Sequence, residues 1–343
     1  MSWRFGEYPF AEPVREVMRM PSAKQRVTAT DVARSLGLSR ATVGFVLNNT
    51  PGQTIPEKTR QRVLAEAERL GYRPNRAAQT LRRGSSRLVL LVLPDWPVED
   101  SMADYVDELA CALDRAGYSL ITYTRRAADR SRPLWESVTP DVVIGLADFD
   151  AEEQDSLRAS GVRRVVIGTV GRSEAAVAGV GLQVEHLYSL GHRRLAYATG
   201  CDERLADLVA ARVAAAQGAA ERLGLEPLDV REVGTGEASA VTSVLAWRDS
   251  GVTGVVAYND TVAAIVVGAA MRAGIGVPAP LAVIGHDDTR LAAVFVPSLS
   301  SVRMDAAGVA RYTADLALHA AGELAAAPEP TLPTMTMIRR ESS

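Results

Sequence analysis

The hydrophobic positions divide the chain into two parts with different periodicities. Residues 27–72 show only the three- and four-residue spacing of short amphipathic helices. From Leu88 onward, short runs of leucine and β-branched residues alternate with longer helical patterns. These runs lack polar alternation, as expected for parallel strands that are buried on both faces. The pattern predicts a helical N-terminal domain followed by an α/β body.

The body is predicted to contain two sheets. Its strand candidates are Leu88–Leu93, Ser119–Tyr123, Val142–Leu146, Val165–Gly168, Leu195–Ala198, Val230–Val233, Val255–Ala257, Leu281–Gly285 and Thr334–Ile338. The helical patterns between them stop at glycine, which takes the left-handed conformation after a helix without a Cβ clash. Alternating strands and helices specify a doubly wound, Rossmann-like α/β fold. Because about 250 residues are too many for one such unit, two units with a cleft between them fit better.

Composition and pattern together give the domain boundaries. The predicted segments are a loose extension at 1–26, a helical domain at 27–72, a polar and arginine-rich hinge at 73–86, and a body at 87–343. Met18 or Met20 is an alternative start of the chain. The predicted subdomains of the body are 87–172 with 291–320, and 173–290 with 321–343.

Residues 28–48 have the layout of a helix-turn-helix. Thr30 is predicted to cap the first helix and Ser39 the second, and Gly37 allows the tight turn between them. A third helix over Glu57–Leu70 closes the small core. Its core residues are predicted to be Val63, Leu64, Ala67 and Leu70. A unit of this kind presents the first turn of its second helix to the major groove of DNA.

Charge is distributed unevenly along the chain. Residues 22–87 carry a net charge of +9 and residues 88–343 a net charge of −12, within a total of −3. A basic head on an acidic body suggests that the head meets a polyanion, although a solvated surface is the alternative. No apolar run reaches the roughly 18 residues of a membrane span, and residues 1–21 lack the apolar stretch of a signal peptide. The chain is therefore expected to act in the cytoplasm, without a membrane partner.

Several spaced motifs resemble the lac-repressor-type (LacI/GalR) family of transcriptional regulators. In the head and hinge these are Thr30-Asp-Val-Ala33, Gly37-Leu-Ser39, Leu47-Asn48 and Leu70-Gly-Tyr-Arg-Pro-Asn-Arg-Ala-Ala78. In the body they are Leu190-Gly-His-Arg-Arg194, Tyr258-Asn-Asp260 and Val283-Ile-Gly-His-Asp-Asp-Thr289. The resemblance implies a homodimeric regulator, in most cases a repressor, that binds a pseudo-palindromic operator in double-stranded DNA. It also implies a periplasmic-binding-protein-like body whose cleft binds a small-molecule effector that controls DNA binding.

In that family the residues just after the serine cap of the second helix read bases. The matching positions are Arg40 and Ala41, followed one turn later by Gly44 and Phe45. Arg40 can donate two hydrogen bonds to a guanine, and Ala41 and Phe45 can pack on thymine methyl groups. The alternatives are that Arg40 contacts only phosphate and that Phe45 belongs to the core. The predicted DNA-binding residues are Thr30, Ser39, Arg40, Ala41, Thr42, Gly44, Phe45, Asn48, Asn75, Ala77, Ala78 and Leu81.

The hinge resembles the hinge helix of the same family over Pro74–Leu81. By this resemblance Asn75 would cap the helix, and the small Ala77 and Ala78 would let two such helices approach closely. Leu81 matches the leucine that wedges into the minor groove and kinks the duplex. The alternative is an ordinary linker turn in which the body covers Leu81.

Ligand groups in doubly wound folds sit at the carboxyl ends of the strands. The predicted effector-binding residues are Asp95, Trp96, Arg212, Asn259, Asp260, His286 and Asp287. Asp287 matches the effector-binding carboxylate of the family. Where the family usually has an arginine this chain has Ala215 and Ala216, so Arg212, one turn earlier, is the substitute. Asp260 as a helix N-cap and His286 as a packed residue are the alternatives. The effector class, whether sugar, nucleoside or other, stays open, as does a regulator that responds to no effector.

The sequence contains no motif for enzyme chemistry. It has no Gly-x-Gly-x-x-Gly at the first helix of the body, no Walker lysine motif and no Gly-x-Ser-x-Gly elbow. The four histidines and two cysteines show no zinc spacing, and Cys111 is expected to be inert core. We therefore expect no catalytic residue, metal or cofactor. The alternative from another class is a solute-binding protein with the same body fold.

Replacement of Leu81 by alanine removes the predicted wedge but no charge. We expect Leu81→Ala to weaken binding to a selected operator and to reduce the bend of the DNA, while nonspecific affinity and its salt dependence stay nearly constant. Circular-permutation gel mobility measures the bend. An unchanged bend would mean that Leu81 packs against the body rather than in the groove.

Overall fold

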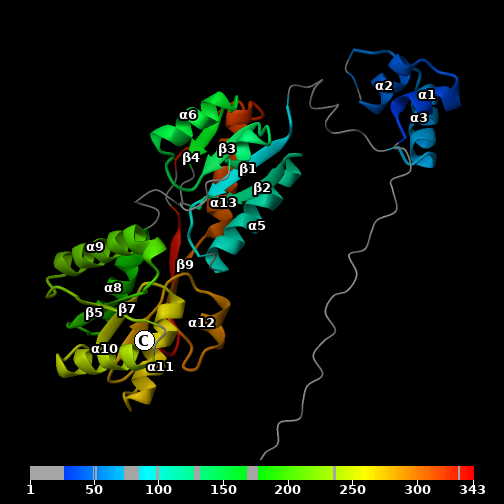
Figure 1. The fold of residues 1–343 in the computed structure, drawn as a ribbon. Coiled ribbons are helices and arrows are strands. Elements are labelled where there is room, and N and C mark those ends of the chain that lie inside the picture. Colours follow the sequence, from blue (N-terminus) through cyan, green and yellow to red (C-terminus); the bar gives the residue numbers. More distant parts are fainter. Residues whose placement is uncertain are drawn as a thin grey trace, which may run out of the picture. The chain divides into compact units, whose positions relative to one another are not determined.

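The computed structural model describes residues 27–343 apart from 49, 51, 73–84, 98–99, 127–131, 168–176, 235–236 and 331–332. The chain forms two compact units that divide between Gly84 and Ser85 (Figure 1). The first unit contains the helical head and the second contains the α/β body. The predicted extension at 1–26 and the hinge residues Asn75, Ala77, Ala78 and Leu81 lie outside the described residues.

The head is a three-helix unit. Its helices are α1 (Ala29–Leu36), α2 (Arg40–Leu47) and α3 (Glu57–Arg69). They enclose a small core of Val32, Ala33, Val43, Val46, Val63 and Ala67. Leu64, which was predicted to join this core, is 49% exposed. Val63 and Ala67 lie one turn apart on the inner face of α3, and Leu64 is rotated away from that face.

Hydroxyl side chains begin the first two helices. Ser39 Oγ accepts a hydrogen bond from the Thr42 amide at 3.0 Å, so Ser39 caps α2 as predicted. The prediction that Thr30 caps α1 is wrong, because the cap is Thr28. Thr28 Oγ1 accepts from the Asp31 amide at 3.3 Å, and the Asp31 carboxylate accepts from the Thr28 amide at 2.9 Å. This reciprocal box needs an acid three residues after the cap, which Thr28 has and Thr30 lacks.

The first lobe of the body is built on a parallel sheet in the order β2-β1-β3-β4. Its strands are β1 (Leu88–Leu93), β2 (Ser119–Thr124), β3 (Val142–Gly145) and β4 (Val165–Ile167). Two helices pack together on one face of this sheet, namely α5 (Asp100–Arg115) and α13 (Ala306–Ala321). The other face is covered by the short helix η1 (Leu134–Glu136) and by α6 (Ala151–Ala159). Both faces are therefore buried, as the apolar strand sequences predict.

The second lobe also has helices packed around a sheet (Figure 1). Its strands are parallel, in the order β6-β5-β7-β8. Its strands are β5 (Leu195–Thr199), β6 (Asp229–Glu232), β7 (Gly254–Ala257) and β8 (Ala282–Ile284). Its helices are α8 (Val180–Ser189), η3 (Glu203–Leu205), α9 (Ala206–Arg222), α10 (Glu237–Asp249), α11 (Asp260–Arg272) and α12 (Arg290–Val294). The helix α8 contacts α9, and α10 contacts α11. Each of the nine predicted strands overlaps an observed one, and the doubly wound prediction is confirmed.

Two antiparallel strands join the lobes. They are β9 (Ser301–Met304) and β10 (Met335–Ile338). Met304 packs against the core of the first lobe and Met337 against the core of the second. The sequence analysis predicted β10 but missed β9, whose apolar residues alternate with Ser301 and Arg303. Its pattern is that of a half-exposed strand, unlike the continuous apolar runs of the two sheets.

The predicted boundary between the two subdomains, at residue 291, lies too early in the chain. Ala292 and Leu299 are fully buried within the core of the second lobe. Residues up to the start of β9 therefore belong to the second lobe, because α12 carries an apolar side chain into that core.

Cys111 is exposed, which contradicts its predicted place in the core. The buried stripe of α5 is formed by Tyr105, Leu109 and Leu113, at four-residue spacing. Cys111 lies midway between two positions of this stripe and so points to another side of the helix.

Asp141 fastens the start of the body to the first sheet. Its carboxylate accepts hydrogen bonds from the Ser86 amide at 2.8 Å and from the Arg87 amide at 3.1 Å. The hydroxyls of Ser85 and Ser86 also donate to it. Burial by itself raises the pKa of Asp141, but these donors outweigh burial and hold it below its ordinary value. The carboxylate thereby fixes the point at which the chain enters β1.

Replacement of Asp141 by asparagine should lower the free energy of unfolding of the body by about 1–3 kcal/mol at pH 7, because partly buried donors lose their charged acceptor. The folded-state pKa of Asp141 lies below the unfolded value of 3.8. Its stabilisation is therefore complete above that value and is lost as the pH falls through the folded pKa. Denaturant titrations of wild type and variant should differ most near pH 7 and least in acid.

The matched control is Asp155→Asn, since Asp155 is exposed and pairs with Arg158 on the same helix. An equal loss of stability in both variants would contradict the role assigned to Asp141.

Candidate functional site

The first turn of α2 is solvent-exposed and carries a positive charge. Arg40 and Ala41 are exposed, whereas Val43 and Val46 are buried in the core of the head. Phe45 is partly exposed and lies outside the core cluster that the described residues form. The arrangement leaves a cation and two apolar groups available on a short helix.

The other predicted DNA-binding residues of the head are partly engaged in the helix ends. Thr42 Oγ1 shares a hydrogen bond of 2.9 Å with Ser39 Oγ, and Asn48 Nδ2 donates to the Gly44 carbonyl at 2.7 Å. Thr30 is exposed on α1. A Cβ added to Gly44 would meet nothing within 4 Å, so packing within the head does not require glycine there.

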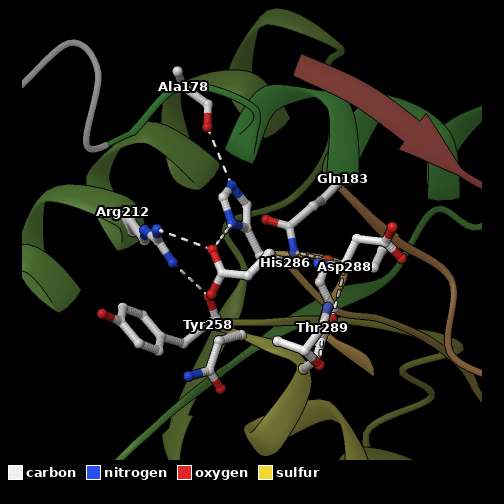
Figure 2. A network of polar contacts seen from close by, with 12 residues as sticks. Ala178, Gln183, Arg212, Tyr258, His286, Asp288 and Thr289 are labelled. Atoms are coloured by element: carbon white, nitrogen blue, oxygen red, sulfur yellow. Dashed lines mark hydrogen bonds and ion pairs between the residues drawn. The ribbon is translucent and has the colours of Figure 1, made fainter. Parts of the chain in front are cut away.

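In the body, polar side chains gather at the carboxyl ends of β7 and β8 (Figure 2). Arg212, on α9, is 8% exposed and lies over the Tyr258 ring, with its Cζ 4.7 Å from the ring centroid. Its guanidinium donates to the Tyr258 carbonyl at 2.8 Å and lies 3.9 Å from Asp287 Oδ1. The structure thus brings together Arg212 and Asp287, two of the residues predicted to bind an effector.

Asp287 occupies a turn of unusual backbone conformation. Asp287 and the next residue, Asp288, have φ values of 94° and 50°, in the left-handed region that disfavours residues with a Cβ. His286 Nδ1 lies 2.8 Å from Asp287 Oδ1. Burial by itself raises the pKa of Asp287, but the neighbouring His286 and Arg212 outweigh burial and hold it below its ordinary value. The aspartate is therefore a buried, charged acceptor.

Asp260 binds other parts of the protein through its carboxylate. It accepts hydrogen bonds from the Thr289 amide at 2.6 Å, the Thr289 hydroxyl at 3.0 Å and the Ser301 hydroxyl at 2.6 Å. The alternative that Asp260 caps α11 is wrong, because Asn259 is the cap and accepts from the Val262 amide at 2.9 Å. Burial is the main cause that raises the pKa of Asp260 to about 6.

Gly285 lies directly against the Asp260 carboxylate. A Cβ at Gly285 would stand 2.1 Å from Asp260 Oδ1, which no real contact allows. Glycine is therefore required at position 285 for the turn that follows β8 to lie against the buried acid.

Asp288 links the same turn to both connecting strands. Arg303, on β9, donates from Nε to Asp288 Oδ2 at 2.6 Å. Arg340, just beyond β10, lies 2.6 Å from Asp288 Oδ1. The Asp288 side chain is only 2% exposed, so this double pairing compensates a buried charge.

Asp95 and Trp96 follow β1 in the first lobe but contact the second lobe. Asp95 Oδ1 lies 3.8 Å from Arg204 on η3. Trp96 is partly buried against the core of the second lobe. Asp95 thus contacts η3, which immediately precedes the helix α9 that carries Arg212.

Sequence analysis missed three residues of the body cluster. Gln183, fully buried on α8, donates to the carbonyls of Ala257 and Gly285 at 3.0 and 2.8 Å. Tyr258 supports Arg212, and Asp288 pairs with two arginines. An amide at a buried position of a largely apolar helix was a usable signal for Gln183. Tyr258 and Asp288 stand within motifs that resemble the family, but the sequence assigned neither of them a role.

No group of histidine, cysteine and acidic side chains in the part of the chain that the structure describes is arranged to hold a metal ion. Among the helices of that part, none has the length and apolar character to cross a membrane.

Comparison with protein families gives two matches. Residues 28–75 match the family described as bacterial regulatory proteins, lacI family. Residues 184–343 match a periplasmic binding protein-like domain. The first match covers the helix-turn-helix and the second covers the lobe that holds the Asp287 cluster.

Curated relatives and solved structures agree with these matches. The chain is 33% identical to the HTH-type transcriptional regulator MalR of Streptomyces coelicolor over 302 residues, which cover 80% of this chain and 84% of the relative. It is 32% identical to GalS of Salmonella typhimurium over 323 residues, which cover 87% and 91%. Its fold is similar to that of the lac repressor dimer bound to operator and the anti-inducer ONPF, with a TM-score of 0.73 at 22% identity, covering 93% and 99%. The chain belongs to the lacI family of bacterial regulatory proteins, and it is a transcriptional regulator rather than an enzyme.

Proposed function

We propose that this regulator represses transcription by binding a pseudo-palindromic operator as a homodimer in the cytoplasm, and that a small molecule bound beside Asp287 controls this binding. The observation that carries the proposal is the capped helix α2, which leaves Arg40 and Ala41 exposed while its valines fill the core. The similarity in fold to a repressor crystallised on its operator with an anti-inducer supports the same proposal.

The first turn of α2 suits base recognition in the major groove. A guanidinium at Arg40 can donate to O6 and N7 of a guanine together, which distinguishes that base from the other three. Ala41 and the partly exposed Phe45 supply apolar surface for thymine methyl groups. Gly44 adds no side chain on the next turn, although the head has room for one. A close approach of the helix to the bases would account for that glycine.

The Asp287 cluster suits a ligand that carries hydroxyl or amino donors. Its carboxylate is charged, buried and held in place by a turn that also binds α9 and the connecting strands. Carboxylates in such positions accept strong charge-assisted hydrogen bonds. Arg212 adds donors near the same carboxylate, and the Tyr258 ring lies against the guanidinium.

An apolar patch on the second lobe supports the homodimer. Leu291, Val294 and Val296 are 39%, 75% and 77% exposed on α12 and the segment after it. Exposed apolar side chains that lie together mark surfaces for association. A second copy of the chain is the occupant that a two-fold symmetric operator requires.

Arg40→Ala should weaken binding to a selected operator by about 1–3 kcal/mol and relax the base preference at one position in each half-site, because a bidentate contact to guanine is lost. Affinity measurements on the operator and on its single-base variants give both quantities. A uniform loss on all DNA, with the preference unchanged, would show that Arg40 contacts only phosphate.

Arg34→Ala is the matched control for that experiment. Arg34 lies on α1 of the same head, is 77% exposed at its side chain and pairs with Asp31. Loss of one charge from the head should change nonspecific affinity in both variants to a similar extent. Only Arg40→Ala should change the base preference.

Asp287→Asn should abolish the response to effectors with little change in the volume of the side chain. A thermal-shift screen of the full-length protein against sugars, nucleosides and purines identifies a compound that raises Tm of the wild type. That compound should leave Tm of Asp287→Asn unchanged and should no longer alter its affinity for the operator. Asp155→Asn is the surface control, and an undiminished shift in Asp287→Asn would place the effector elsewhere.

A further inference from the structure

Both ring nitrogens of His286 face hydrogen-bond acceptors (Figure 2). Nδ1 lies 2.8 Å from Asp287 Oδ1, and Nε2 lies 3.2 Å from the backbone carbonyl oxygen of Ala178. A carbonyl oxygen only accepts hydrogen bonds, and so does an ionised carboxylate. A neutral imidazole has one N–H and one lone pair, so it can satisfy one of these partners and must repel the other. Only an imidazolium donates to both.

The charges around His286 favour the same protonation state. Its nearest charged partner is the buried carboxylate of Asp287, which also has Arg212 at 3.9 Å. The Asp260 amide donates to the His286 carbonyl at 3.0 Å, while the Asp260 carboxylate is bound by Thr289 and Ser301.

The other acid of the same turn, Asp288, has partners of its own. Asp288, on the same turn, is occupied by Arg303 from β9 and Arg340 beyond β10. His286 is itself only 2% exposed, so a charge on its ring is tenable only beside a carboxylate such as that of Asp287.

His286 also lies where the connections between the lobes converge. Gly179, which has a φ of 86° and precedes α8, shows this most directly. A Cβ at Gly179 would lie 2.8 Å from Val302 of β9, 3.2 Å from His286 Nε2 and 3.3 Å from Met335 of β10. The ring tip of His286 therefore touches the segment that enters the second lobe, beside both connecting strands.

We propose that His286 is held as an imidazolium and acts as a positioning residue, whose two N–H groups fasten the Asp287 carboxylate to the segment at Ala178 that leads into α8. The role of Asp287 as the effector's acceptor rests on the proposed function above. The charge of His286 and its attachment to Ala178 do not.

The two hydrogen bonds of the imidazolium connect the proposed ligand site directly to the segment between the lobes. A donor that binds to Asp287 Oδ1 competes with His286 Nδ1 for that oxygen. Loss of the ring proton has a related effect, because a neutral ring keeps only one of its two bonds. Either change loosens the link between the 286–288 turn and Ala178, without a contact at the connection itself.

The charge of His286 can be tested in the full-length wild-type protein by NMR with 15N-labelled histidine. Long-range proton–nitrogen spectra at pH 7 distinguish an imidazolium, with two protonated nitrogens, from a neutral ring. We expect two protonated nitrogens for His286. His186 and His192 are internal controls, since burial lowers the pKa of each below its ordinary value, and each should be neutral. A single protonated nitrogen on His286 at pH 7 would overturn the proposal.

Assignment does not depend on a variant at position 286. The three other histidines of the chain, at 186, 192 and 319, can be replaced one at a time, so that His286 is identified by elimination. Asp287→Asn supplies a further readout, because without the carboxylate the ring of His286 should become neutral at pH 7. An imidazolium that persists in Asp287→Asn would show that another group holds the charge.

The attachment to Ala178 is tested by amide hydrogen exchange at the start of α8. His286→Gln replaces the two ring N–H groups by one amide nitrogen, which cannot span the two acceptors as the ring does. Exchange in the first turn, where the Gln183 amide bonds to the Gly179 carbonyl, should therefore accelerate about tenfold. His192→Gln is the matched control, because His192 bonds to the Thr253 hydroxyl instead. Unchanged exchange at residues 179–183 in His286→Gln, or equal acceleration in both variants, would overturn the attachment, whether or not an effector is ever found.

Discussion

Buried carboxylates that must be paired are the constraint on which the body of this regulator depends. Asp260, Asp287 and Asp288 lie within one small region, and an unpaired buried charge there would be strongly destabilising. Each acid satisfies this requirement through groups from a different part of the chain. The 285–289 turn is consequently bound to α9, α11, β9 and the end of β10 at once. A conformation with two successive left-handed residues persists because so many partners fix it.

The backbone of the same turn is hydrogen-bonded to the connecting segment at β9. The Gly285 amide donates to the Ser300 carbonyl and the Asp287 amide to the Val302 carbonyl, each at 2.8 Å. A change at the Asp287 side chain therefore acts on a segment that is already hydrogen-bonded to the route between the lobes. This arrangement gives a physical basis for coupling the ligand site to the geometry between the lobes. Coupling of this kind lets two ligands influence each other through one shared structural element.

The fold of the head depends instead on residues that are close together in the sequence. A capping box, a serine cap and a core of six small or branched residues define three short helices. With so little to bury, the head leaves Arg40 and Ala41, at the start of α2, exposed to solvent. The surface that suits DNA recognition thus arises from the residues that packing does not use, whereas the body cluster arises from residues that packing forces together.

The sequence by itself determined what depends on short-range pattern. Periodicity and glycine positions gave the two sheets and their order of strands along the chain. Ser39 was predicted correctly as a cap, and its partner, the Thr42 amide, is only three residues away. The motifs of the head, Tyr258–Asp260 and Val283–Thr289 were sufficient to indicate the family. Thr28 was missed in favour of Thr30 although the reciprocal acid, Asp31, was visible in the sequence.

Only the tertiary structure decided what depends on distant partners. Arg212 and Asp287 are 75 positions apart, and no local pattern shows that a guanidinium one turn away from its expected place still reaches the acid. Asp260 could be read as a helix cap until Ser301 and Thr289 were found on its carboxylate. The strand β9 was recognisable only beside β10, since half-exposed strands are defined by the strand they pair with. Burial of charge is a property of the assembled fold, and hence so is the role of every acid in the 260–288 cluster.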